Sequence, residues 1–428
     1  MAAAGGMAGF QQTTTYKVVL PFYTYGAFAF LAAVILLFFN TDLVSEHHFN
    51  PVTLTITHLM ALGWGTMIIL GASHQLLPVL ISGKLQSVFL GHLAFIFTAI
   101  GIPLLAVGFY NFKFDWLIKT GAILVNLGVV SYLINVIISI RKSEKQEIHA
   151  WFMLTATIWL FTTTFFGLLL VYNYNGNTIF NESSLSYLSL HAHMGIIGWF
   201  LTLVFGVGSR LIPLFLISKY TSPKTLWAVY LLVNAGLISF IVFRLANFSA
   251  SSYYISILLV LAAVGLFGNY CIKAYQTRIR KKVDFQVKLS LISILEMMIP
   301  VIVLIAVIAI LPTGNHKNIA ILYGFCVFFG WITAIIFGMT FKTMPFIVWN
   351  KVYQKGRRTA TSTPPAPKEL FSENIYRATM YTYLAAYILF VAGIIILNSI
   401  LLKTAAAILL ISAVLYVINV LKTLFHKA

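Results

Sequence analysis

Long runs of apolar residues, separated by short polar segments, fill most of the chain. A helix of about 20 apolar residues crosses the hydrocarbon core of a bilayer. The runs predict twelve such helices, at about residues 19–39, 54–81, 88–109, 117–140, 151–171, 188–217, 226–243, 253–272, 289–311, 319–349, 380–397 and 402–421. We therefore expect an all-α, polytopic membrane protein with twelve transmembrane helices in a single transmembrane domain, residues 1–428.

One pattern of spaced residues occurs three times, on the second, sixth and tenth predicted helices. Counted from His58, His193 or Phe325 as position zero, glycine follows at positions five and thirteen, tryptophan at six and proline at twenty. The matched residues are Gly63, Trp64, Gly71 and Pro78, then Gly198, Trp199, Gly206 and Pro213, and finally Gly330, Trp331, Gly338 and Pro345. Self-similarity at a fixed spacing indicates an internal repeat.

The spacing of this pattern divides the chain into three units of four helices, at about residues 19–150, 151–283 and 284–428. Three such units predict a pseudo-symmetric bundle in which the three motif helices surround the centre. Twelve-helix carriers of the major facilitator type repeat as six plus six helices. A four-helix period does not fit that class.

Composition agrees with a membrane protein, because 60% of the residues are hydrophobic and only 9% are charged. The net charge of +18 could suggest nucleic acid, but Lys and Arg mark the cytoplasmic loops of membrane proteins. If both termini are cytoplasmic, about 23 of the 28 Lys and Arg residues lie inside, several of them in a predicted cytoplasmic linker loop at residues 351–377. We expect a lipid bilayer, and no nucleic acid, as partner.

Two histidines, His58 and His193, occupy position zero of the pattern. Both helices are expected to run inward from the outer face, so both side chains lie at similar depth in the outer half of the membrane. Ionisable residues at such a depth are costly and indicate function, and histidine is an axial ligand of haem iron. We expect this pair to clamp a haem. The alternative is two core histidines, each hydrogen-bonded to a serine or a carbonyl.

A third histidine, His191, lies two residues before His193. On a helix this separation turns the two side chains about 200° apart, so they cannot bind the same iron. His191 is therefore a second candidate ligand, for another haem or a copper ion. The alternative is an interfacial residue that binds nothing.

Two further ionisable residues are candidates for a proton path or a polar site. His74 lies roughly 24 Å along the helix from His58, too far to share its iron. We expect an interfacial position for His74, where His92 could join it. Glu296 lies in the ninth predicted helix, where a carboxylate must be paired, hydrated or neutral. We expect a neutral, hydrogen-bonded carboxyl there, with a proton path as the alternative.

These motifs resemble those of subunit I of haem–copper oxidases and of the large subunit of nitric oxide reductases. The segment HAH, with His191 and His193, resembles the His-x-His pair that serves the two haems on the tenth helix of that superfamily. The segment HMGIIGW and the later RLIP resemble the tenth helix of cbb-type oxidases. His58 resembles the haem ligand of the second helix, and GASHQLLP resembles the end of that helix in nitric oxide reductases.

The chain also departs from the superfamily pattern. Its HAH pair is on the sixth predicted helix, and the tenth has Phe325 at the corresponding position. The copper site of the superfamily needs a histidine on the sixth helix and an adjacent His-His pair on the seventh, and residues 226–243 contain no histidine.

The NnrS family, a twelve-helix branch linked to haem, copper and nitric oxide stress, is also similar. Its early helix has histidine, glycine and proline where His58, Gly63, Gly71 and Pro78 stand, and its later helix resembles His193, Gly198 and Arg210. The acidic residue after its early histidine and its Gly-His-Thr-Gly-Arg ending have no counterpart in this chain.

The resemblance implies a multi-pass haem protein of the bacterial inner (plasma) membrane. His58 and His193 would hold a haem b, and His191 a second haem or copper. The protein would act in respiratory electron transfer, or bind or reduce oxygen or nitric oxide as an oxidoreductase, with an electron-donor cytochrome or other respiratory subunits as partners. The alternatives are a non-catalytic haem or copper scaffold or sensor of the same fold, and a secondary transporter that uses Glu296.

Overall fold

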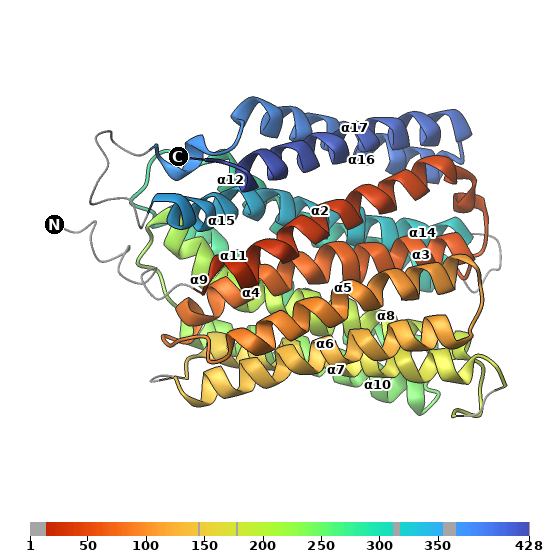
Figure 1. The fold of residues 1–428 in the computed structure, drawn as a ribbon. Helices are drawn as coiled ribbons and strands as arrows, with labels where there is room; N and C mark the ends of the chain where they lie inside the picture. The colour runs from red at the N-terminus through yellow and green to blue at the C-terminus, as the bar shows by residue number, and fades with distance from the viewer. Residues whose placement is uncertain (1–13, 144–145, 177–178, 311–316, 354–364, 428) are drawn as a thin grey trace.

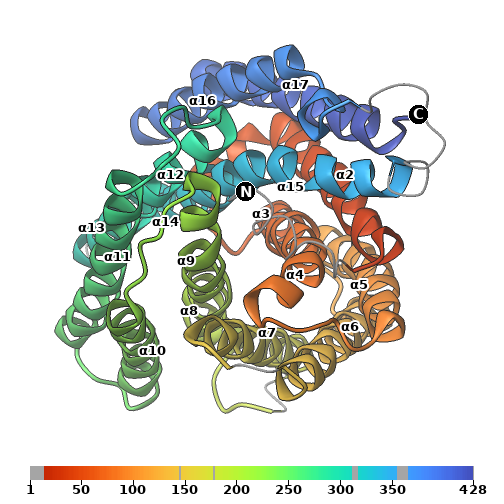
Figure 2. The same cartoon turned by 90° about the vertical axis from the view of Figure 1, so that its left-hand side faces the viewer.

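The computed structural model describes residues 14–143, 146–176, 179–310, 317–353 and 365–427. Within them, twelve helices are long and apolar enough to cross a membrane, as predicted, and there is no sheet. Figure 1 shows these helices running side by side, and Figure 2 shows them end on. The first helix begins and the last helix ends at the same end of the bundle (Figure 1).

Nine of the spans are not interrupted by a π-helical turn. They are α2 (Tyr16–Phe39), α5 (Val88–Tyr110), α6 (Trp116–Arg141), α7 (Ile148–Asn173), α10 (Pro223–Leu245), α11 (Tyr253–Gln276), the pair α12 (Phe285–Glu296) and α13 (Met298–Ile310), α16 (Glu373–Ile396) and α17 (Ser399–Leu424). Of the predicted linker at 351–377, the first residues belong to the preceding helix and the last to α16, while 354–364 lie outside the described residues.

Capping side chains fix where several helices begin. Ser87, Asp115, Ser372 and Asn398 each accept a hydrogen bond from a backbone N–H in the first turn of α5, α6, α16 and α17, respectively. These residues satisfy N–H groups that no intrahelical carbonyl can reach. The sequence pattern of apolar residues alone did not locate these ends, and α16 begins several residues before the predicted 380.

The three motif helices share an unusual construction, because a π-helical turn interrupts each of them. The second span joins α3 (Pro51–His58), η3 (Leu59–Thr66) and α4 (Met67–Leu80). The sixth joins α8 (Leu188–His193), η5 (Met194–Leu201) and α9 (Thr202–Leu216), and the tenth joins α14 (Lys317–Phe325), η8 (Cys326–Ile332) and α15 (Thr333–Tyr353). Each π-helical segment begins one residue after position zero. Such segments are rare and frequently mark functional sites.

The glycine at position thirteen of each motif lets another helix approach closely. A Cβ at Gly71 would lie 2.7 Å from the Cβ of Phe22 on α2. At the equivalent Gly206 and Gly338 it would overlap Phe152 of α7 and Ser290 of α12. In all three cases the neighbour belongs to the helix that precedes the motif helix along the chain. These glycines therefore hold each motif helix against its predecessor.

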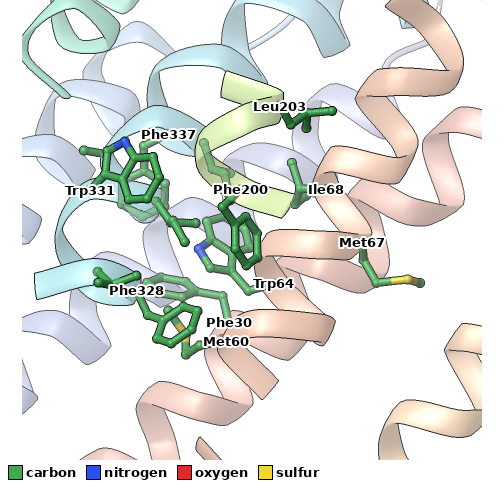
Figure 3. Close-up of a cluster of buried hydrophobic side chains, with 14 of the residues drawn as sticks. Phe30, Met60, Trp64, Met67, Ile68, Phe200, Leu203, Phe328, Trp331 and Phe337 are labelled. Atoms are coloured by element: carbon green, nitrogen blue, oxygen red, sulfur yellow. The ribbon is translucent and has the colours of Figure 1, made fainter. Parts of the chain in front are cut away.

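The three motif tryptophans are buried at the centre of the bundle, where Figure 3 shows Trp64 and Trp331 among Phe200, Phe328 and other apolar side chains. Trp199 donates from Nε1 to Thr66 Oγ1 over 3.1 Å, and Trp64 donates to Thr333 Oγ1 over 3.1 Å. Trp331 Nε1 is buried with no hydrogen-bond partner among the described residues. The tryptophans thus connect the three motif helices directly.

Candidate functional site

A cavity of about 460 Å³ lies between α3 and α8, which carry the histidines, and the neighbouring α7 and α14. It is on the side of the bundle away from the chain termini (Figure 1). Its walls are apolar, and His58, His191 and His193 all reach them. The structure thus brings the three histidines that we selected from the sequence to one cavity.

His58 is held in a fixed tautomer by its own helix. Its Nδ1 lies 2.8 Å from the backbone oxygen of Leu54, and since a carbonyl only accepts, Nδ1 carries the proton. The ring stacks on Phe109 of α5, with centroids 4.3 Å apart and planes 23° apart. The other nitrogen, Nε2, is left with a lone pair, as in histidines that bind metals.

His191 faces His58 from the neighbouring motif helix. The two ring centroids are 6.3 Å apart and the ring planes are inclined by 23°. The Nδ1 of His191 is buried and has no hydrogen-bond partner in the described part of the chain. Its ring lies against Gly167 of α7, where a Cβ would come within 2.7 Å of the His191 Cε1. Gly167 therefore makes the room that this ring occupies, a role that its sequence context did not indicate.

The centroid separation of the two rings is similar to that of two imidazoles that hold one metal atom. Imidazole nitrogens bind metals at about 2.0–2.1 Å, so two imidazoles on opposite sides of one metal have centroids about 6 Å apart. The observed 6.3 Å agrees with that arrangement. The cavity that both rings line is about 460 Å³ in volume and mainly apolar.

His193 has different neighbours from those we expected. Its Nδ1 lies 2.7 Å from the backbone oxygen of Ser189, and its Nε2 lies 3.3 Å from the hydroxyl of Tyr323 on α14. The rings of His193 and Tyr323 are stacked, with centroids 5.8 Å apart, and Phe240 lies on another side. The imidazole that faces His58 is thus His191. Only one of two histidines spaced two residues apart can do so, because they point in different directions.

The other two candidates lie away from this cavity. His74 is fully buried inside the protein and stacked on Phe22, with its Nδ1 2.7 Å from Leu70 O and its Nε2 unpaired among the described residues. Glu296 lies at the break between α12 and α13, and its Oε2 is buried without a hydrogen-bond partner among those residues. The hydrogen bond that we expected for this carboxyl oxygen is therefore not seen.

One histidine outside the spans also reaches the cavity. His48 lies in the loop before α3, lines the cavity, and stacks on His47 with centroids 4.2 Å apart. Partial burial and the neighbouring His47 both lower the pKa of His48 below its usual 6.5. His48 is therefore largely neutral at pH 7. A neutral imidazole can line an apolar cavity without the cost of burying a charge.

Comparison with known proteins adds no assignment. No model of a known protein family matches the chain, and a search of curated proteins found no significant sequence similarity.

Proposed function

We propose that this chain is a haem-binding membrane protein related to the haem–copper oxidases, in which His58 and His191 would hold one haem b. The observation that supports this proposal is that the two imidazoles face each other beside an apolar cavity. It modifies the expectation from the sequence, in which His193 was the partner of His58. His193 instead has a hydrogen-bonded neighbour of its own.

The roles of the surrounding residues follow from their contacts. A bound haem supplies an iron that exchanges one electron at a time. Leu54 O keeps the proton on Nδ1 of His58, so Nε2 stays available as a ligand. Phe109 orients the His58 ring by stacking, and Gly167 leaves space for His191. The apolar walls exclude water, which is one way in which a protein sets a redox potential.

Electron transfer is the activity that this arrangement favours. His58 and His191 would both be engaged in holding the haem and neither would be free to act on a substrate, so reduction of oxygen or nitric oxide is disfavoured. Among the described residues, no group of three His, Cys, Asp or Glu side chains could hold a metal, unlike the three-histidine copper site of the oxidases. An electron-donor cytochrome or other respiratory subunits would be the partners. Copper bound by the same two imidazoles is the alternative cofactor.

One observation favours a second candidate function, the non-catalytic sensing of a diatomic gas such as nitric oxide. His58 is anchored through Nδ1, whereas Nδ1 of His191 has no partner among the described residues. Of the two residues that would hold the haem, His191 is thus the less constrained, which would suit a site that admits a gas. A scaffold or sensor of this type would bind haem but turn over no substrate.

We also propose a membrane arrangement. The π-helical segments begin at the same position of each motif, which supports three pseudo-symmetric four-helix repeats. The chain begins and ends at one end of the bundle, and the loops with most Lys and Arg residues connect helices at that end, which supports cytoplasmic termini. A respiratory haem protein of this kind would be a multi-pass protein of the bacterial inner membrane.

An absorption spectrum tests the proposal. Purified protein from cells with ample haem supply should show sharp reduced haem bands after dithionite. The bands should be lost in His58→Ala and in His191→Ala but retained in the matched control His193→Ala. A carbon monoxide shift in the wild-type protein would favour the sensor, and its absence would favour electron transfer. A wild-type protein without haem would contradict the proposal and leave a transporter that uses Glu296.

A further inference from the structure

Two loops lie against each other at the end of the bundle that carries the chain termini, the end that faces the viewer in Figure 2. They are residues 217–222, between α9 and α10, and residues 277–284, between α11 and α12. Ser218 and Arg278 form an antiparallel β-bridge, and the hydroxyl oxygens of Ser218 and Thr277 are 2.8 Å apart. The two segments, called the paired loops below, therefore form one surface.

The paired loops and the helix turns beside them carry a strong excess of positive charge. Residues 217–224 and 273–284 contain seven basic residues and a single acidic one, Asp284. Asp284 is already engaged, because it pairs with Arg280 over 2.7 Å and also with Lys342 of α15. No other acidic residue of these segments can pair with the remaining cations. The seven basic residues are Lys219, Lys224, Lys273, Arg278, Arg280, Lys281 and Lys282.

Arg278 is held in place and still has donors that no residue uses. Its Nη1 donates to the backbone oxygen of Tyr275 over 2.7 Å, and its guanidinium carbon lies 3.8 Å from the centroid of the Tyr275 ring. Its Nε is buried, and neither Nε nor Nη2 has a hydrogen-bond partner among the described residues. Guanidinium groups bind phosphates through parallel hydrogen bonds from one edge. A fixed guanidinium with unpaired donors is thus suited to a phosphate.

Two large apolar side chains lie beside these charges. Ile217 and Ile279 are 55% and 63% exposed, and Ile279 N donates to Ile217 O over 3.2 Å, so the two residues are neighbours. Both lie within three residues of a helix end, because α9 ends at Leu216 and α11 ends at Gln276. Such a position is level with the boundary between acyl chains and headgroups. Adjacent cationic and apolar side chains are typical of surfaces that lie in this boundary.

We propose that the paired loops bind one anionic phospholipid of the adjoining leaflet, with Arg278 at the phosphate and Ile217 and Ile279 against the acyl chains. Topology alone places Lys and Arg at one end of a membrane protein, but it requires neither a fixed guanidinium nor exposed isoleucines. These features also favour a lipid over an acidic protein or a nucleic acid, because a lipid offers a phosphate next to acyl chains. The inference does not depend on haem.

Native mass spectrometry of the purified full chain, with phosphatidylglycerol and phosphatidylcholine of identical acyl chains at equal concentration, tests this inference. We expect the chain to retain one phosphatidylglycerol in preference to phosphatidylcholine. Arg278→Gln should lower this preference about fivefold, the effect of one cation near an anionic headgroup. The double variant Lys281→Gln with Lys282→Gln removes two exposed cations and should lower it further. Ile279→Ser should weaken the binding of both lipids and leave the preference unchanged.

The matched control is Arg141→Gln, which removes the same charge at the same end of the bundle but from the end of α6. It should keep the wild-type preference, as should His58→Ala, so that a failure of the haem proposal stays separate from a failure here. Circular dichroism and gel filtration establish that each variant is folded. If Arg278→Gln does not fold, the double lysine variant provides the same test with exposed residues.

Four results would overturn the inference. Equal binding of the two lipids by the wild type would mean that the paired loops select no headgroup. An equal loss of preference in Arg278→Gln and Arg141→Gln would mean that general surface charge attracts the lipid. Displacement of phosphatidylglycerol by excess inorganic phosphate would indicate a site for soluble phosphate, and its displacement by polyglutamate would indicate a site for an acidic protein.

Discussion

The two pairs of facing rings, His58 with His191 and His193 with Tyr323, differ in one chemical respect. The first pair presents an unprotonated nitrogen on His58 and a ring on His191 whose Nδ1 has no hydrogen-bond partner among the described residues. In the second pair, the tyrosine hydroxyl already occupies the equivalent nitrogen. A similar backbone framework thus presents an open pair of ligands at one interface and a closed hydrogen bond at the other. The identity of a single residue, His191 or Tyr323, decides which of the two forms.

The largest expected effect is on haem content, when His191 of the first pair is replaced by the tyrosine of the second. In His191→Tyr, the new hydroxyl would donate to Nε2 of His58, as Tyr323 donates to His193. The lone pair that we propose binds iron would then be occupied, and haem content, measured as the pyridine haemochrome, should fall close to zero. His193→Tyr is the control and should keep its haem. Haem at the wild-type level in His191→Tyr would show that the first pair is not the site.

A smaller effect is expected from narrowing the space behind the first pair. A Cβ at Gly167 would lie 2.7 Å from Cε1 of His191, so Gly167→Ala should push this ring off its position. We expect about tenfold weaker haem binding, comparable to the loss of a residue that supports a metal ligand. Gly265 has no atom within 4 Å of such a Cβ, so Gly265→Ala is the matched control. Equal haem affinity in the two variants would place the His191 ring elsewhere.

The smallest expected effect is on the free energy of unfolding, when one of two motif tryptophans is replaced. Trp199→Phe and Trp331→Phe remove the same group from two buried sites, but only Trp199 loses a hydrogen bond, the one to Thr66. Trp199→Phe should therefore lower the free energy of unfolding by about 1 kcal/mol more than Trp331→Phe does. Thermal or denaturant unfolding in detergent measures this difference. The opposite order would mean that Trp331 has a partner, such as a bound water.

The reason for that difference is visible in the sequence once the structure is known. Thr66 and Thr333 are eight residues after His58 and Phe325, and each accepts from a motif tryptophan. The same position after His193 is Leu201, whose side chain has no hydroxyl to accept a hydrogen bond. Trp331 is thus without a partner in the described part of the chain because one hydroxyl is missing from a pattern of three.

The twelve helices and the three histidines that line the cavity could be predicted from the sequence, because they follow from periodicity and from the cost of polar groups in lipid. The sequence did not predict that His58 faces His191. Which of two histidines spaced two residues apart faces a neighbour depends on how each helix is rotated about its axis, and packing sets that rotation. The roles of Gly167 and Phe109 were not predicted for the same reason, because they depend on how α7 and α5 pack against the motif helices.

The three π-helical segments make the site depend on how many residues its helices contain. Each segment lies between the ring-bearing part of a motif helix and the part that Gly71, Gly206 or Gly338 holds against the preceding helix. One residue of an α-helix accounts for about 100° of rotation. Loss of one residue from Leu59–Thr66 would turn His58 away from His191 by about that angle, although neither histidine had been replaced. The length of this segment is therefore part of the site, and deletions there should be tolerated less well than substitutions.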